Sequence, residues 1–208
     1  MFKQTKTNKP NPTNQINPIM FEKLINPFRY LSLRQAMSWG IVALLLTSVF
    51  CWQNGISLES LTQITFAEST LFDCILRQVA MWLFFSVLLY VSGLMFSHSK
   101  VRFIDVASFT MFARIPYDLT LLLFLSPMIR NAMEVVSNRD FAAIGSNIPG
   151  LTIYSLVSLV LLAWFFTWCY KGFAESTNLK NGRGIWIFAL CFTVAFFTSP
   201  FVVKYIGF

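Results

Sequence analysis

Arg114 and Asp118 are the residues of this sequence whose types and spacing best suit chemistry. They lie four positions apart within residues 103–129, a stretch that is otherwise largely apolar. On a helix this spacing places both side chains on one face, where they can form an ion pair. Inside a membrane each charge costs about 2.5 to 3.5 kcal/mol, and pairing reduces that cost. We interpret the pair first as a structural contact and second as a site for an ion or a solute.

Two neighbouring residues complete the candidate intramembrane polar site. Pro116 removes a backbone hydrogen bond to Phe112, so a kink is expected between the two charged residues. Asp105 lies nine positions before Arg114, on the opposite side of a straight helix, and its simplest role is to cap the first turn. The complete candidate site is Asp105, Arg114, Pro116 and Asp118.

Motifs for catalysis, cofactors and metals are absent from the sequence. It contains no HExxH, no GxSxG, no phosphate-binding loop and no GxGxxG. His98 is the only histidine, and no second imidazole or carboxylate cluster accompanies it as a metal site would require. We therefore predict a protein that is not an enzyme and that has no catalytic residues, no cofactor and no metal.

Long gaps between charged residues predict transmembrane helices. The chain of 208 residues is 56% apolar and only 12% charged, whereas about a quarter of a typical globular domain is charged. A membrane-spanning helix needs about 20 mostly apolar residues. Uncharged gaps of this length lie between Arg34 and Glu59, Arg77 and Lys100, Asp140 and Lys171, and Arg183 and Lys204. The sequence therefore predicts an all-α, multi-pass membrane protein.

Residues 103–129 decide whether the chain crosses the membrane four or five times. They form either a kinked third crossing or a re-entrant pair of short helices. With the N-terminus in the cytosol, five crossings place 11 of the 16 basic residues on the cytosolic side, and four crossings place 12 there. We favour five, because the short loop 171–184 carries three basic residues that would otherwise lie outside. The expected crossings are 36–53, 79–97, 103–129, 149–170 and 185–203, within a transmembrane domain of residues 36–205.

The first 35 residues divide into a tail and an interfacial segment. Residues 1–18 are rich in Lys, Pro and Asn and have little to bury, so a disordered basic tail is expected. Residues 19–35 mix apolar and charged side chains as a segment at the membrane surface does. The membrane-surface basic residues are Lys3, Lys6, Lys9, Lys23, Arg29 and Arg34.

The first 35 residues carry a net charge of +5, because Glu22 is the one acid beside these six basic residues. Basic residues close to an anionic cytosolic leaflet gain about 1 kcal/mol each. The lysines are spaced out and lack an aromatic stacking surface, so no nucleic-acid partner is expected.

Three short motifs make the sequence resemble the Yip1 family as it occurs in bacteria. The first is Asn26, Pro27 and Phe28. The second is Ala113, Arg114, Ile115 and Pro116. The third is Tyr170, Lys171, Gly172 and Phe173, followed by Asn178, Leu179 and Lys180. The resemblance covers roughly residues 24–205 and implies five crossings with an outward C-terminus.

The resemblance also implies a class of function. Eukaryotic members of the family are associated with small GTPases of the Rab type and with vesicle traffic or membrane shaping. Their DLYGP signature is absent here, so Rab binding is not carried over. The resemblance implies a non-enzymatic scaffold or membrane-organising protein of the bacterial cytoplasmic membrane. Its expected partners are the lipid bilayer and other membrane proteins or further copies of itself. The alternative is a small transporter or channel component that uses Arg114 and Asp118.

Overall fold

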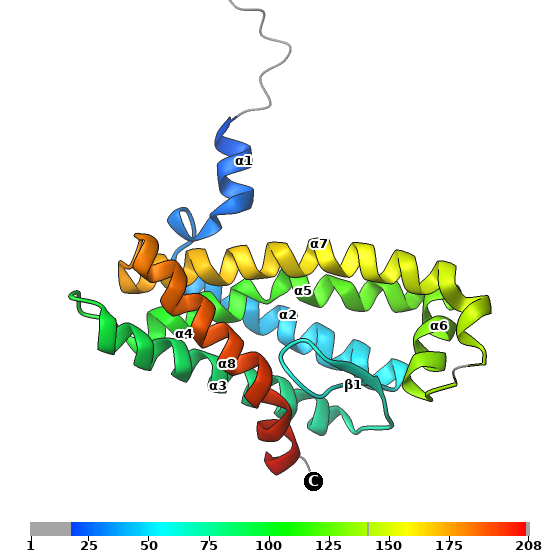
Figure 1. The fold of residues 1–208 in the computed structure, drawn as a ribbon. Coiled ribbons are helices and arrows are strands. Elements are labelled where there is room, and N and C mark those ends of the chain that lie inside the picture. The colour runs from blue at the N-terminus through cyan, green and yellow to red at the C-terminus, as the bar shows by residue number, and fades with distance from the viewer. Residues whose placement is uncertain (1–17, 141, 207–208) are drawn as a thin grey trace, which may run out of the picture.

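The structure is a computed structural model that describes residues 18–140 and 142–206, and most of these residues are helical (Figure 1). Five helical segments are long and apolar enough to cross a membrane: Leu33–Asn54, Leu71–Phe96, Phe103–Leu125, Ile144–Thr177 and Gly182–Tyr205. The prediction of an all-α, multi-pass protein with five membrane-spanning segments is confirmed. The expected tail lies outside the described residues, apart from Pro18.

The helices and strands follow one another in a simple order. They are α1 (Pro18–Ile25), η2 (Pro27–Arg29), α2 (Leu33–Asn54), β1 (Ile56–Leu58), β2 (Ile64–Phe66), α3 (Leu71–Phe96), α4 (Phe103–Ala113), α5 (Ile115–Asp118), η3 (Leu119–Leu125), α6 (Pro127–Ser137), α7 (Ile144–Thr177) and α8 (Gly182–Ile206).

Capping residues define where the first two long helices begin. The hydroxyl of Ser32 accepts a hydrogen bond from the Gln35 amide, and the Gln35 side chain accepts one from the Ser32 amide. Thr70 and Asp73 make the same reciprocal pair at the start of α3. Each pair satisfies amides that a helix N-terminus leaves free. Helix α2 ends at Gly55, whose left-handed φ of 62° is easily adopted by glycine.

The third spanning segment lies in the centre of the bundle and is broken. Helix α4 packs against α2, α3 and α7, and 72% of the apolar window of Phe103–Leu125 is buried, against 11 to 33% in the other four spans. The α-helix is interrupted at Arg114, and the chain continues as the short α5 and then as the seven-residue 3₁₀ helix η3. Runs of 3₁₀ helix longer than three or four residues are uncommon.

Small residues and polar side chains hold the spans together. At Gly40 an added Cβ would lie 2.6 Å from Met111 Cγ, so glycine lets α2 approach α4 closely. Gln78 is buried in α3, where its amide nitrogen donates to Ser48 Oγ at 2.9 Å and its amide oxygen accepts from Thr47 at 3.0 Å. Because lipid offers no hydrogen bonds, such contacts between spans satisfy both partners.

A small hairpin covers one end of the bundle. Strands β1 and β2 pair antiparallel, with Ile56 opposite Phe66 and Leu58 opposite Ile64. Ile56 and Leu58 are buried against the helices. The Leu61 amide donates to Ser199 Oγ of α8 at 3.2 Å, so the hairpin loop is attached to the last span. The hairpin and the end of α8 lie away from α1 (Figure 1).

Candidate functional site

The predicted pair of charges is formed at the break in the third span. Arg114 Nε lies 3.2 Å from Asp118 Oδ1, and the two side chains are only 8% and 7% exposed. Arg114 links the end of α4 to α5, and Pro116 occupies the first turn of α5, where its missing N–H costs nothing. The contact has the i, i+4 spacing, although the α-helix is interrupted at Arg114.

The guanidinium of Arg114 is only partly satisfied by this contact. Its Nη1 and Nη2 atoms are buried and have no hydrogen-bond partner among residues 18–140 and 142–206. Leaving a buried donor unsatisfied costs about 1 to 3 kcal/mol. The free N–H groups can therefore donate to water, to a carbonyl group or to an anion.

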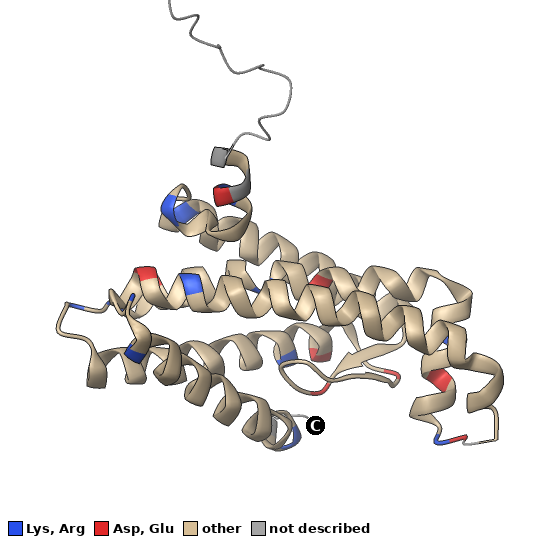
Figure 2. Cartoon of the chain, turned by 45° about the horizontal axis from the view of Figure 1, so that its top comes forward, with Lys and Arg blue, Asp and Glu red and all other residues tan. Residues whose placement is uncertain are grey.

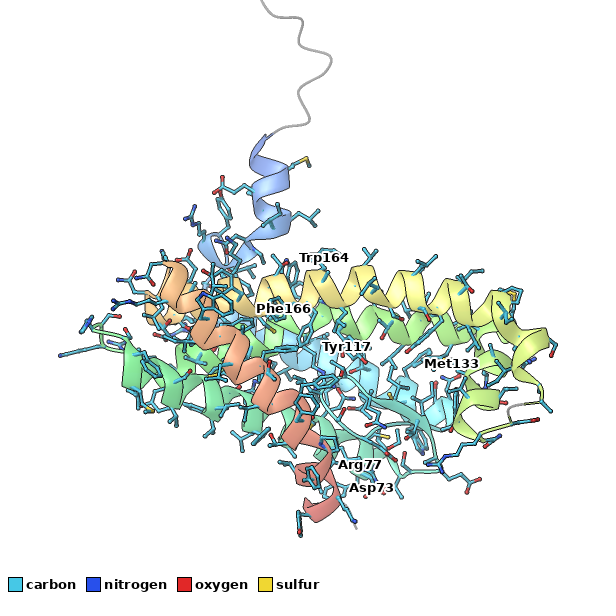
Figure 3. The ribbon with its side chains drawn as sticks, viewed as in Figure 1. Asp73, Arg77, Tyr117, Met133, Trp164 and Phe166 are labelled. Carbon is cyan, nitrogen blue, oxygen red and sulfur yellow. The ribbon has the colours of Figure 1, made fainter. Side chains whose placement is uncertain are left out.

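Hydrogen bonds fix the backbone around the pair. The hydroxyl of Tyr117 donates to the carbonyl of Thr62 in the β1–β2 loop. The Thr120 hydroxyl donates to the Tyr117 carbonyl at 2.7 Å. Figure 3 shows Tyr117 in the middle of the bundle, so the hairpin loop reaches the centre of the third span.

An apolar groove of about 420 Å³ leads from the lipid-facing surface to Asp118. It runs between α2 and the α5–η3 segment, and its walls include Leu46, Phe50 and Leu122. Leu46 and Leu122 are exposed on the outside of the bundle. The acidic end of the ion pair is thus reached from the bilayer side.

Asp105 is separate from the pair. It lies in the first turn of α4, one turn into the helix from Arg102, which is the N-cap residue. Nine residues of helix separate Asp105 from Arg114, about 14 Å along the axis. Its buried Oδ1 has no partner among the described residues. The expected capping bond from Asp105 is not formed, because Arg102 is the N-cap residue and Asp105 lies within the first turn.

The first and third sequence motifs meet at a second place, where η2 packs against α7 and the Phe28 ring reaches α4. The Phe28 ring is 4% exposed and lies 5.0 Å from the Phe109 ring and 5.9 Å from the Phe112 ring. An added Cβ on Gly172 would lie 3.0 Å from the Phe109 Cβ, so glycine allows the close approach of α7 to α4 beside the Phe28 ring. The Trp168 ring completes the pocket.

Glu175 ties the same segment to α7 through charge. Its carboxylate accepts from Arg29 Nε at 3.1 Å and from the Asn26 amide at 3.3 Å. Lys180 Nζ lies 2.7 Å from the other carboxylate oxygen. The hydrogen bond to Glu175 raises the pKa of the Arg29 guanidinium. The sequence analysis missed Glu175, although it is the one acid in a basic turn, which was the available signal.

The membrane-surface basic residues are only partly within the described chain. Lys3, Lys6 and Lys9 lie outside it. Lys23 is exposed on α1 with its ammonium 5.4 Å from the Tyr30 ring, and Arg34 is exposed in the first turn of α2. In the drawn residues the charged groups gather at helix ends and in connecting loops, with few along the middle of the spans (Figure 2).

Comparison with known families gives one match. A family model described as the Yip1 domain matches residues 22–202, a range that includes the ion pair, Phe28 and Glu175. Comparisons with curated proteins and with solved structures give no match. The family match confirms the resemblance that the three motifs predict.

Proposed function

We propose, since this chain belongs to the Yip1 family of multi-pass membrane proteins, that it is a non-enzymatic scaffold or membrane-organising protein. The observation that carries this proposal is the position of α1. The helix extends sideways from α7 (Figure 1), and its Met20 and Leu24 side chains are 71% and 51% exposed. Two indole N–H groups, of Trp164 and Trp168, donate to the Leu24 carbonyl and hold the helix beside the bundle.

A helix in this position acts on one leaflet. Its exposed apolar side chains enter the region between headgroups and acyl chains, and its basic residues favour anionic lipids. Residues 19–35 then serve as the interfacial segment and residues 1–18 as a basic leash, ahead of a transmembrane domain of residues 36–205. The partners are the bilayer and other membrane proteins or further copies of this chain.

The proposed orientation places the N-terminus in the cytosol of a bacterium and the protein in the cytoplasmic membrane. With five spans the tail shares its side with the loops after α3 and α7, which gives that side 11 of the 16 basic residues. Short basic loops remain on the cytosolic side. We expect a periplasm-active reporter fused after Phe208 to be active and a cytosol-active reporter at the same position to be silent. The opposite pattern would reject the five-span orientation.

The membrane-organising role predicts a specific effect of the double variant M20N/L24N. Removing two exposed apolar side chains should weaken the insertion of α1 by about 3 kcal/mol, roughly a hundredfold. The backbone bonds from Trp164 and Trp168 to Leu24 are retained in this variant. We expect the full chain, reconstituted in vesicles containing phosphatidylglycerol, to lose its remodelling of vesicle shape, measured by electron microscopy.

The matched control for this experiment is L94N/M95N. Leu94 and Met95 are 53% and 71% exposed, close to the values for Leu24 and Met20, but they belong to the end of the spanning helix α3. We expect this control to remodel vesicles as the wild type does. Equal behaviour of the two double variants would contradict a role for α1.

A transport or channel role is the second candidate, and the unpartnered Nη1 and Nη2 atoms of Arg114 favour it. Ionisable groups inside a membrane often mark ion or solute paths. The double variant R114L/D118M separates the two candidates. Loss of solute flux with normal membrane insertion would favour transport. Intact folding with unchanged vesicle remodelling would favour the scaffold role.

A further inference from the structure

A polar cavity lies at the end of the bundle opposite to α1, where α3 begins and α8 ends. Its volume is about 420 Å³, and its charged and polar lining comes from the hairpin loop, α3 and α8. The lining residues are Glu59, Gln63, Arg77, Pro200, Val203 and Lys204. Figure 3 shows Arg77 near the C-terminal part of α8.

The charges around this cavity are not paired with one another. In the described part of the chain, neither Arg77 nor Lys204 lies within 4.0 Å of a carboxylate, and Glu59 has no basic partner. Arg77 Nη1 donates to Ser57 Oγ at 2.8 Å, which fixes the side chain. Its Nε is buried and has no partner among the same residues. Two cations and one anion therefore line the same cavity, and all three can still form hydrogen bonds with a ligand.

A second cavity adjoins the first on the side toward the middle of α8. It measures about 340 Å³ and shares Gln63 and Pro200 with the polar cavity. Its other walls include Phe196 and Phe197, which are 44% and 66% exposed. The joined cavities are thus polar at one end and aromatic at the other.

The spacing along α8 explains this gradient. Phe196, Pro200 and Lys204 follow one another at intervals of four residues, so they lie on the same side of the helix. One turn of helix advances about 5.4 Å. Lys204 therefore lies roughly two turns beyond Phe196, near the headgroup layer, when α8 spans the membrane.

We propose that the joined cavities bind one phospholipid with a zwitterionic, amine-bearing headgroup, in the leaflet opposite to α1. Arg77 and Lys204 bind the phosphate, and Glu59 accepts hydrogen bonds from the ammonium group. The acyl chains follow Phe196 and Phe197 into the bilayer. The site is independent of the proposed action of α1, which concerns the other leaflet.

Charge complementarity selects this headgroup over its alternatives. An anionic phosphatidylglycerol headgroup carries no positive charge for Glu59, so its hydroxyls offer that carboxylate only neutral donors, which form weaker hydrogen bonds than an ammonium group does. A choline headgroup has a positive charge but no N–H donors, so it forms no hydrogen bond with the carboxylate. Ethanolamine provides both the charge and three N–H donors.

The test is lipid binding to the purified full chain, measured by native mass spectrometry with phosphatidylethanolamine, phosphatidylcholine and phosphatidylglycerol of identical acyl chains. We expect phosphatidylethanolamine to bind most tightly, and K204Q to weaken its binding about tenfold, the effect of losing one charge-assisted hydrogen bond. The matched control K171Q removes a basic residue from α7 and should bind as the wild type does. E59Q should abolish the preference for ethanolamine over choline.

Several results would overturn the proposal. Equal binding of the three lipids to the wild type, or equal losses in K204Q and K171Q, would show that the cavity does not select a headgroup. Retained selectivity in E59Q would reject the assigned orientation of the headgroup. Soluble glycerophosphoethanolamine provides the remaining arm. If it binds as tightly as the lipid, the cavity is a site for a soluble phosphate ester instead.

Discussion

The variant D118N should lower the free energy of unfolding by about 3 to 5 kcal/mol, the cost of leaving one charge of a buried pair without its partner. Asparagine keeps an oxygen that can accept the hydrogen bond from Arg114 Nε, but it removes the negative charge. The guanidinium, whose side chain is 8% exposed, then remains charged and buried. Unfolding of the purified protein in mixed micelles by increasing sodium dodecyl sulfate measures this loss.

The control for D118N is E134Q. Arg130 and Glu134 form an ion pair with the same spacing and an Nε–Oε1 distance of 3.0 Å, but their side chains are 36% and 42% exposed. Exposed pairs of this kind contribute about 0.3 to 0.5 kcal/mol. If D118N cost no more than E134Q, burial would not govern the energetics of the Arg114 pair.

The double variant R114L/D118M tests the pair with both charges removed. It removes both charges together with the two unpartnered guanidinium nitrogens, and replacing a buried ion pair by apolar residues is often neutral or stabilising by about 1 to 4 kcal/mol. We therefore expect its stability to match or exceed that of the wild type. A double variant as unstable as D118N would show that shape, and not charge, dominates at the break.

The spanning helices were predictable because the bilayer imposes a constraint that is visible along the chain. A span needs a minimum length of apolar residues whatever its neighbours are. The charge gaps therefore located α2, α3, α7 and α8. Their ends were less predictable: α3 begins at Leu71 and α7 extends from Ile144 to Thr177, beyond the expected crossings 79–97 and 149–170. Thr70 and Asp73 extend α3 by capping, which hydrophobicity does not record.

The third span was predictable only in part. Pro116 and the charges beside it gave a local signal for a break, and the i, i+4 spacing gave the ion pair. The central position of the segment depends on packing against α2, α3 and α7. A segment surrounded by other helices has no polar face, so its sequence shows no helical period that would indicate this position. The seven-residue 3₁₀ run of η3 had no signal of its own.

Contacts between distant segments were not accessible from the sequence. The ion pair of Arg29 with Glu175 joins residues 146 positions apart, and the hydrogen bond of Leu61 with Ser199 joins residues 138 apart. Neither spacing has a helical or strand period. The hairpin of β1 and β2 was missed for a related reason, because strands of three residues are too short to show alternation.

The variant F28A should release the interfacial segment from the bundle. The Phe28 side chain is 4% exposed and contacts the rings of Phe109, Phe112 and Trp168. Truncating a buried phenylalanine to alanine costs about 3 to 5 kcal/mol. The remaining links are the partly exposed Glu175 pair, which contributes about 1 kcal/mol or less, and the two indole hydrogen bonds to the Leu24 carbonyl, which contribute about 1 kcal/mol each. They hold the segment more weakly than the buried ring does. We expect hydrogen exchange of residues 18–32 to accelerate about a hundredfold or more, while exchange in α3 and α8 stays unchanged.

Two comparisons make this result specific to the docked ring. F201A removes a phenylalanine that is 63% exposed on α8, so it should leave exchange in residues 18–32 as it is in the wild type. E175Q removes the charge of the second link and should accelerate exchange about fivefold or less. If E175Q loosened the segment more than F28A, charge rather than aromatic packing would hold it. The attachment of the interfacial segment would then weaken as the salt concentration rises, because salt screens a partly exposed ion pair. Burial of an aromatic ring is not weakened in this way.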